Sequence, residues 1–522
     1  MNLFRGRLSV GEMLPFPKVL KEEQTQRLQE MVGPTAKFLE SEVDAAKNDL
    51  QGKFDEKVLS MLGELGVYGL QAPEIYNGSG LNNTEYARLV TLVGHSDLSL
   101  GVHLGAHQSI GYKGILLYGT EKQKAKYVPD LAAGKKFAAY CLTEPDSGSD
   151  VSSIQAKAEL SPDGKHYILN GTKVWISNGG LADIFTVFAK VPVENVLGPV
   201  GEGFKIAVNI LNQGRFSMSA VLSGTMREVI KQTLQYTSQR KQFGRTLNEF
   251  QNVQEKLTNM AIRQYVTEAM AYILSGMMDL GAKDFQVEAA MSKIYSSESA
   301  WYCVDEAIQI HGGTGYMKDT NLERILRDLR VFRIFEGAND ILRLFISLTG
   351  LNYAGKHLAA RAQSPFGAVG LAADRCKRVV GLGGSGSSLT KLLPPPLAEP
   401  AALAGNAIDA FGAASTLLLS LYRKEVIEEQ FRLTRLADAA IQIFAMVCAL
   451  SRSAKALQEH SQLADYELHL AKLVCYQGSK TIDHCLSELD KSADGKCFDL
   501  IQSVSSRLLQ QGDVVCPSPL GF

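Results

Sequence analysis

Helical periodicity in this chain is interrupted by one short β-rich stretch, and this interruption limits the folds that the chain can adopt. Apolar residues recur at helical spacing up to about residue 137, as in KEEQTQRLQEMVGPTAKFLESEV. Three short runs rich in β-forming residues follow, KHYILNG, TKVWISNGG and DIFTVFAKV, and Gly and Asn separate them. The helical pattern returns from GFKIAVNIL onward. The sequence therefore predicts a mainly α protein with a small central β-domain.

The later helical part is divided by a stretch rich in Gly, Ser and Pro, residues 381–400, which is typical of a linker. Beyond it, apolar residues between Leu433 and Val447 recur at intervals of three and four, which predicts a further helical domain. The predicted domains are an N-terminal helical domain (1–137), a middle β-domain (138–200), a helical bundle (201–352), a linker (353–404) and a C-terminal helical domain (405–522).

Composition argues against several classes of protein. The 54 Lys and Arg residues balance 55 Asp and Glu residues, so the basic excess of a nucleic-acid-binding protein is missing. The 8 cysteines are scattered without a CxxC pair, which predicts reduced thiols and no metal site. No uninterrupted apolar run reaches the roughly 18 residues of a membrane span. The N-terminal MNLFRGRLSVGEM lacks the apolar core of a secretory signal and is too short to indicate a transit peptide.

Two segments of the β-rich stretch could bind a ligand. In CLTEPDSGSD, the backbone N–H groups at Gly148 and Ser149 could face an anion, although a plain Asx or Gly turn explains the same residues. In KVWISNGG, Trp175 and Ser177 lie two residues apart on a predicted strand, so they share a face that suits a flat heteroaromatic ligand. The alternative is a tryptophan in the core.

Two later segments have the residues of a nucleotide site. SQRKQFGR contains Arg240 and two further cations, which suit a pyrophosphate, although a solvated helix end is the usual interpretation. QIHGGTGYMKD contains Gly312 and Gly313, but this cluster follows a helix and is weak by itself. His311 in the same segment is interpreted as a structural or peripheral histidine rather than a base.

Glu336, in RIFEGANDIL, is the candidate acid or base. It follows Phe335 in an apolar environment, and the glycine after it would let another molecule approach closely. The alternative is a surface glutamate before a turn, since sequence alone does not reveal the pKa of a single acid.

In this order and spacing, the five segments resemble the acyl-CoA dehydrogenase family of flavoenzymes, and most closely its very-long-chain branch. The resemblance runs from about residue 20 to about residue 350. It implies a helical domain, a β-domain and a four-helix bundle, followed here by the C-terminal helical domain. It also implies a homodimer in mitochondria, associated with the inner membrane on the matrix side.

The activity implied by the resemblance is FAD-dependent α,β-dehydrogenation of long-chain or very-long-chain fatty acyl-CoA to trans-2-enoyl-CoA. This is the first step of mitochondrial fatty acid β-oxidation, and the electrons pass to electron-transferring flavoprotein. Glu336 would remove the α-proton, which requires a dry pocket that raises its pKa toward neutrality. Hydride from the β-carbon would pass to the flavin.

The resemblance also assigns roles to other residues in this sequence. The group expected near the flavin ring comprises Tyr140, Leu142, Thr143, Trp175, Ile176 and Ser177. Gly148 and Ser149 would meet the flavin pyrophosphate or the substrate thioester. The group expected to bind the adenosine diphosphate half of a neighbouring subunit's FAD comprises Arg240, Gln251, Gln309, Ile310, His311, Gly312 and Gly313. The residues expected beside the CoA thioester arm or the cofactor next to the base are Asn212, Arg215, Gly337, Ala338, Asn339 and Asp340.

Two further segments bear on the acyl chain and on the membrane. Gly111 and Gly114 in GAHQSIGYKGILL leave room for a long alkyl chain, but close helix packing explains them equally well. In PFGAVGLAADRCKRVVG, apolar residues recur at helical spacing with Arg375, Lys377 and Arg378 between them. This pattern is that of a membrane-surface helix, and a solvated linker is the alternative.

The sequence departs from the family pattern in its middle. DIFTVFAK passes directly to VPVENVLGPVGEGFK, where family members have several more strands, so the shortened β-domain would leave unpaired strand edges. An inactive variant, or a non-catalytic assembly or structural protein, is therefore an alternative. Ala338 stands where the family usually has Thr, which removes a hydroxyl contact to FAD. An oxygen-using acyl-CoA oxidase ranks third, because CPSPLGF lacks a peroxisomal ending.

Overall fold

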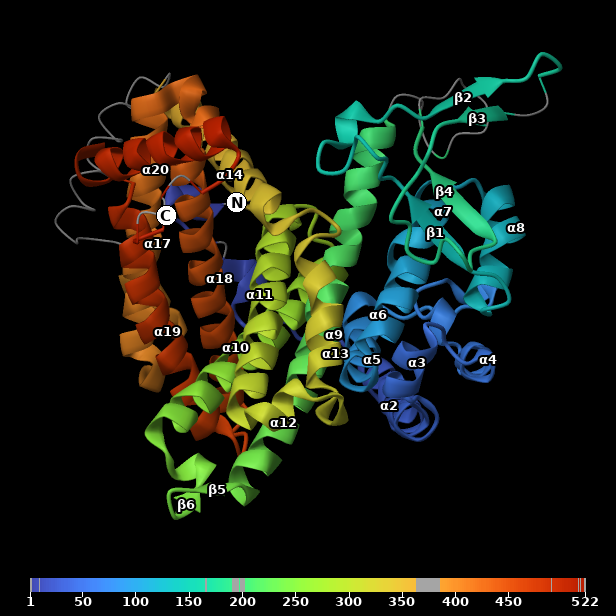
Figure 1. Cartoon of the computed structure of the whole chain (residues 1–522), viewed down its shortest axis with the longest axis horizontal. Helices are drawn as coiled ribbons and strands as arrows, with labels where there is room; N and C mark the ends of the chain where they lie inside the picture. Colours follow the sequence, from blue (N-terminus) through green and yellow to red (C-terminus); the bar gives the residue numbers. More distant parts are fainter. Residues whose placement is uncertain are drawn as a thin grey trace. The chain divides into compact units, whose positions relative to one another are not determined.

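The computed structural model describes residues 2–8, 10–164, 167–189, 197, 202–362, 385–489, 491–514, 516 and 518–520. The chain forms two compact units (Figure 1): Gly11–Leu342, and Met1–Val10 together with Arg343–Phe522. Every predicted site residue lies in the first of these, which we call the larger unit. All the cysteines that the structure describes are free, as the sequence predicted.

The larger unit begins with helices whose ends are set by capping side chains. Asn82 accepts a hydrogen bond from the Glu85 N–H, and the Glu85 carboxylate accepts one from the Asn82 N–H, which starts α5. A π-helical segment, Gly105–Gly111, follows α6. The α-helices are α1 (Val10–Met13), α2 (Glu22–Glu42), α3 (Ala45–Gln51), α4 (Glu56–Glu64), α5 (Asn83–Ser96), α6 (Leu98–Leu104), α7 (Lys113–Tyr118) and α8 (Glu121–Ala132).

The β-domain consists, among the described residues, of two small sheets of two strands each. Strand β1 (Ala138–Cys141) pairs in parallel with β4 (Ile184–Val187), and β2 (Lys157–Leu160) pairs antiparallel with β3 (Tyr167–Asn170). A two-stranded sheet is marginal by itself. Tertiary contacts therefore have to support both pairs.

The π-helical segment provides such support for β1 and β4. The Ala138 N–H donates to His107 Nδ1 at 3.0 Å, and the Thr186 hydroxyl donates to the Gly111 carbonyl at 2.8 Å. His107 Nε2 lies 3.0 Å from the Leu131 carbonyl, and burial lowers the pKa of His107 to about 3. The histidine is therefore neutral and links the strand to α8.

A helical bundle completes the larger unit. Helix α5 packs closely on α9, because a Cβ at Gly94 or at Gly224 would lie 2.0 Å from a carbonyl oxygen of the facing helix. The bundle helices are α9 (Gly203–Gln239), α10 (Gln251–Asp279), α11 (Gln286–His311), α12 (Gly313–Tyr316) and α13 (Leu322–Leu329). A short hairpin, β5 (Lys241–Gln242) and β6 (Arg245–Thr246), lies between α9 and α10, and α14 (Asn339–Ala362) starts after the Glu336 loop.

The smaller unit is helical, and the apolar stripe predicted between Leu433 and Val447 is buried in α18. Phe4 packs edge-on against Phe411 at 5.0 Å between ring centres, and a Cβ at Gly350 would lie 2.2 Å from the Phe4 ring. The helices, after α14, are α16 (Ser385–Leu392), α17 (Ala398–Tyr422), α18 (Gln430–Gln458), α19 (Ala464–Ser487) and α20 (Lys491–Gln511).

Three predictions concern this region. Residues 353–362 and 385–404 were predicted as linker, but they are largely helical, with Leu389, Leu393 and Leu397 buried. The predicted membrane-surface helix at residues 366–380 lies outside the described residues. Within the described part of the chain, Pro395–Glu428 and Gln430–Gln458 are long and apolar enough to cross a membrane, with 44% and 78% of their most apolar windows buried. A buried core helix meets the same criteria of length and composition.

Candidate active site around Glu336

Glu336 lies in a turn of unusual backbone conformation between a 3₁₀ helix, Arg330–Arg333, and α14. Its φ is 52°, and the φ of Gly337 is 97°, so two successive residues are left-handed. Such a conformation is strained for a glutamate and persists only where the surroundings enforce it. A Cβ at Gly337 would lie 3.0 Å from the Leu342 side chain and 3.3 Å from Arg215 Nη2. Glycine is therefore required after the glutamate.

Two cations from the bundle hold this turn through its carbonyl groups. Arg215, on α9, donates from Nε and Nη2 to the Glu336 carbonyl at 3.2 and 3.1 Å, and from Nη1 to Asn212 Oδ1 at 2.5 Å. Lys293, on α11, donates to the Gly337 carbonyl at 2.9 Å and to Asn339 Oδ1 at 2.8 Å. Two long helices thus fix the position of the loop.

The Glu336 carboxyl has the electrostatics of a base that works near neutral pH. Its Oε2 atom is buried, and the described residues give it no hydrogen-bond partner. Burial raises the pKa of Glu336 to about 7, against the opposing charges of Arg215 and Lys293. Burial also lowers the pKa of Lys293 to about 7, against the opposing charge of Glu336. A carboxyl group in this range can accept and release a proton at physiological pH.

Two tyrosines lie close enough to Glu336 for its charge to act on them. Burial raises the pKa of Tyr86 to about 12, and the Glu336 charge contributes to this rise. Burial likewise raises the pKa of Tyr140, with the Glu336 charge adding to the effect. The Tyr86 hydroxyl lies 2.7 Å from Ser109 Oγ, and the Tyr140 hydroxyl donates to the Ala207 carbonyl at 3.2 Å. Both hydroxyls are therefore neutral and held in place.

The predicted flavin group lies at the start of α9. Tyr140 and Leu142 are buried against Ile206 and Ile210 of that helix. The Val174 N–H donates to the Thr143 carbonyl at 3.1 Å, which brings the Trp175 segment against the end of β1. A buried ion pair, Lys173 Nζ to Glu144 Oε1 at 2.7 Å, strengthens this junction.

The prediction that Trp175 and Ser177 share one face of a strand is wrong. Residues 171–176 have no regular secondary structure and residues 177–180 form a turn, and Trp175 is 90% exposed with a φ of 58°. Ser177 is exposed and Ile176 is half-buried. A strand requires a partner for its backbone groups, and no described strand pairs with this segment. Gly148 and Ser149 are also exposed, in a bend close to Thr143.

The predicted adenosine group lies at the other end of α9. Arg240 follows α9, Gln251 begins α10, and Gln309, Ile310 and His311 end α11. His311 is buried, its ring stacks on Tyr236 at 4.1 Å, and its Nδ1 lies 2.7 Å from the Ala307 carbonyl. These contacts favour the structural interpretation of this histidine. Gly312 has a φ of 61°, and both Gly312 and Gly313 are exposed.

Helix α9 separates the flavin group from the adenosine group within one chain. Its 37 residues correspond to a length of about 55 Å. Figure 1 shows the β1 and β4 pair near one end of α9 and the β5–β6 hairpin near the other. The structure therefore does not bring the two predicted cofactor groups of a single chain together, whereas it does bring Asn212, Arg215, Gly337 and Asn339 to Glu336.

Family models match most of the chain. The matches are the acyl-CoA dehydrogenase N-terminal domain (22–135), middle domain (139–214) and C-terminal domain (201–350), and the ACAD9/ACADV C-terminal domain (395–514). A relative from Mus musculus, named very long-chain specific acyl-CoA dehydrogenase, mitochondrial, is 46% identical over 582 residues that cover 100% of this chain and 89% of the relative. The chain belongs to the acyl-CoA dehydrogenase family. The mouse alignment is 60 residues longer than the 522 residues of this chain.

Solved structures of this family share the fold. An acyl-CoA dehydrogenase from Bacillus anthracis complexed with FAD has a TM-score of 0.81 and 29% identity, covering 94% of this chain and 91% of that one. A chain from a structure of the electron transferring flavoprotein of Acidaminococcus fermentans has a TM-score of 0.59 and 31% identity, covering 63% of this chain and 98% of that one. The predicted fold class, mainly α with a small β-domain, is confirmed.

Gly111 and Gly114, predicted to leave room for an acyl chain in this acyl-CoA dehydrogenase, are buried and closely packed. A Cβ at Gly111 would lie 2.5 Å from the Ala106 carbonyl oxygen, and a Cβ at Gly114 would lie 3.1 Å from Ile210 Cδ1. These contacts favour the packing interpretation, and the acyl-chain role of the two glycines stays a prediction. Beside the base, Ala338 is half-buried and Asp340 is exposed.

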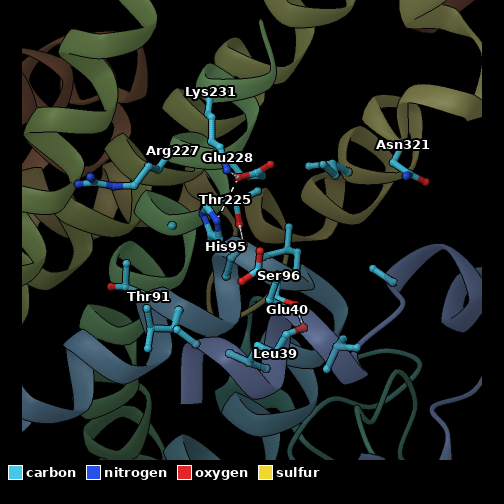
Figure 2. A pocket seen from close by; sticks show the side chains of 18 of the residues that line it. Leu39, Glu40, Thr91, His95, Ser96, Thr225, Arg227, Glu228, Lys231 and Asn321 are labelled. Atoms are coloured by element: carbon cyan, nitrogen blue, oxygen red, sulfur yellow. Dashed lines mark hydrogen bonds and ion pairs between the residues drawn. The ribbon is translucent and has the colours of Figure 1, made fainter. Parts of the chain in front are cut away.

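Sequence reasoning missed Lys293 and a cavity elsewhere in the larger unit. Lys293 could have been found, because AAMSKIY places a lysine within an otherwise buried helical pattern. The cavity has a volume of about 1070 Å³, and none of the predicted site residues lines it. Figure 2 shows that His95 of α5 and Glu228 of α9 face each other there, with 3.0 Å between Nε2 and Oε2. The described residues contain no cluster of metal-binding side chains.

Proposed function

We propose that this chain is a FAD-dependent dehydrogenase that converts long-chain or very-long-chain fatty acyl-CoA to trans-2-enoyl-CoA, with Glu336 as the base. One observation supports this assignment most directly. A carboxyl group with an unpaired buried oxygen and a pKa near 7 lies in a strained turn that two cations hold. Kinship with very-long-chain relatives supports the substrate class.

Each part of the site has a defined task in this reaction. The Glu336 carboxylate accepts the proton from the α-carbon of the acyl thioester, and FAD, when bound, takes the hydride from the β-carbon. The α-proton is weakly acidic, so a dry site that keeps the base near neutrality is needed. Arg215 positions Glu336 relative to the substrate by donating hydrogen bonds to the Glu336 backbone carbonyl, and Asn212 orients Arg215.

The cofactor residues fit FAD as two half-sites. Thr143, Trp175 and Ser177 offer an exposed aromatic ring and hydroxyl groups close to the end of β1. Arg240 and Gln251, at the far end of α9, offer a cation and an amide suited to phosphates. Because about 55 Å of helix separates these groups, one FAD bound by both kinds of residue requires two chains. We therefore infer a homodimer in which the two chains share each cofactor.

Complementation tests this shared site. One variant carries Trp175→Ala and Ser177→Ala, and the other carries Arg240→Glu and Gln251→Ala. Each variant expressed alone is expected to lose flavin, whereas co-expression restores flavin to part of the chains, because a mixed dimer contains one intact site. Mixed dimers that form without regaining any flavin would refute the shared site.

The proposed setting is the mitochondrion, because the very-long-chain relatives are named mitochondrial. Electrons are proposed to pass to electron-transferring flavoprotein, and the similar chain in the Acidaminococcus structure supports this pairing. Attachment to the matrix side of the inner membrane would use the basic segment at residues 366–380. Preferred chain length is to be read from activity on acyl-CoAs of increasing length.

The second candidate is a non-catalytic binding or assembly protein. The small β-domain favours it, because its strands form only two-stranded sheets in the described chain and Phe185 is 47% exposed. Flavin absorbance per chain, before and after anaerobic palmitoyl-CoA, decides between the two. Bound flavin that bleaches supports the dehydrogenase. A soluble chain without flavin supports the binding protein, and peroxide formation in air would instead indicate an oxidase.

The role of Glu336 itself is tested by Glu336→Gln. This variant is expected to keep its FAD and to bind acyl-CoA, but to leave the flavin oxidised, because the amide does not accept the α-proton. Substantial remaining turnover would contradict the assignment. Glu255→Gln, an exposed position on α10, serves as the control.

A further inference from the structure

Lys293 is a charged side chain in one of the most buried parts of the bundle. The residue is 1% exposed, and its neighbours on α11, Met291 and Ile294, are also buried. An ammonium group removed from water is costly unless hydrogen bonds and charge compensate it. Both hydrogen bonds from Lys293 go to the active-site loop, to the Gly337 carbonyl and to Asn339 Oδ1. These hydrogen bonds hold Lys293 against the residues that follow the base.

The hydrogen bonds of Lys293 complete those of Arg215. Arg215 holds the carbonyl of Glu336, and Lys293 holds the carbonyl of the next residue, Gly337. These two residues are the ones with φ values of 52° and 97°. A strained conformation persists when its surroundings hold it on several sides. Lys293, on α11, holds the turn from a different helix than Arg215, which is on α9.

Several charged groups face Lys293. Glu336 and Glu298 favour its charged form, whereas Arg215, Arg333 and burial oppose it. Asn339 connects two of these groups, because its Nδ2 donates to Glu298 Oε1 at 3.1 Å while its Oδ1 accepts from Lys293. Toward Glu336, the cations Arg215 and Lys293 favour the carboxylate, and the tyrosines Tyr86 and Tyr140 are neutral.

We propose that Lys293 is a positioning residue for the base: it fixes the left-handed turn through the Gly337 carbonyl and favours the ionised form of the Glu336 carboxyl. This inference rests on the proposed function for its catalytic meaning. The effect of the buried Lys293 cation on the Glu336 carboxyl does not depend on which substrate the protein binds. Loss of the cation has two consequences: the carboxyl binds its proton more tightly, and the turn loses a hydrogen bond.

The test replaces Lys293 with Met, which keeps an unbranched chain but removes the charge and the donor. The pKa of Glu336 is read from the carboxyl infrared band as the difference between each protein and its Glu336→Gln counterpart, without substrate. Removing a cation whose charge lowers the pKa of the carboxyl is expected to raise the pKa of Glu336 by about one unit. The matched control is Lys113→Met, a half-buried lysine whose Nζ donates to Gln71 Oε1 at 3.0 Å, and this change is expected to leave the pKa of Glu336 unaltered.

Kinetics give the second readout. A pKa moved from about 7 to about 8 lowers the ionised fraction at pH 7 about five-fold, so kcat at pH 7 is expected to fall at least that much with little change in KM. The difference in kcat between wild type and the Lys293 variant is expected to decrease toward pH 9, where the Glu336 carboxyl is ionised in both proteins. Lys293→Gln, which keeps a polar donor, serves if the Met variant does not fold, and the same rise in the pKa is expected.

An unchanged pKa of Glu336 in a folded Lys293 variant overturns the proposal. So does a wild-type pH profile of kcat. Failure of the proposed function is a distinct result: the wild-type protein would then show no bleaching with acyl-CoA, while the infrared titration would still report whether Lys293 acts on Glu336.

Discussion

The buried carboxyl of Glu336 makes stability depend on pH in a way that one substitution should remove. Its pKa rises from an ordinary 4.5 to about 7 on folding, chiefly because burial disfavours the charged form. Each pKa unit corresponds to roughly 1.36 kcal/mol, so the ionised carboxylate costs the folded state about 3 kcal/mol. The cost is absent below pH 4.5, grows between pH 4.5 and 7, and is complete above pH 7.

Glu336→Gln is therefore expected to stabilise the protein at alkaline pH and not at acidic pH. The measurement is urea unfolding of both proteins at pH 4.5 and at pH 8, with Glu255→Gln as the exposed control. The Gln variant should gain up to about 3 kcal/mol at pH 8 relative to wild type and little at pH 4.5. Some of the gain is lost if the amide finds no hydrogen-bond partner. An equal effect at both pH values, or none at pH 8, would refute a raised pKa for Glu336.

Three further changes follow from the geometry. Gly337→Ala should destabilise the protein by about 1–3 kcal/mol and reduce kcat, because the added Cβ meets Leu342 in a left-handed turn. Thermal unfolding and turnover measure the two effects, and a variant that matches wild type in both would contradict the described turn. Trp175→Ala should change the free energy of unfolding by less than about 0.5 kcal/mol but lower the flavin content, since the exposed ring contributes little to the core. A large loss of stability with a full flavin content would contradict a role of Trp175 in flavin binding. Replacing Arg375, Lys377 and Arg378 with Glu should reduce flotation with anionic liposomes, and unaffected flotation would exclude the membrane role.

What the sequence could predict depended on how local each feature was. Glu336 and Gly337 lie side by side in the chain, so the proposed base could be picked out in a short segment. The helical stripe between Leu433 and Val447 is equally local, and it is buried as predicted. The residues that hold Glu336 are distant: Arg215 lies 121 positions away, and Lys293 reaches Gly337 across 44. No single segment contains both members of such a contact.

The errors have the same origin. Trp175 is of a residue type that is common in strands, but a strand forms only where a neighbouring strand pairs with it. No described strand pairs with the Trp175 segment. The stretch before α17 has the composition of a linker, yet Leu389, Leu393 and Leu397 recur every four residues and are buried. Composition was outweighed there by the hydrophobic spacing. Gly111 and Gly114 fit two interpretations in the sequence, and their packed neighbours, some of which lie far away in the chain, favour one of them.

The contact between Phe4 and the smaller unit has a consequence for how the chain is made. Phe4 is synthesised before the whole larger unit, whereas its partners Gly350 and Phe411 are synthesised after it. During translation the segment around Phe4 therefore has no packing partner until more than 300 further residues have been synthesised. Such a long-range closure is slow compared with local helix formation. The smaller unit is thus expected to finish folding only after synthesis of α17, with an early segment inserted as one of the last steps.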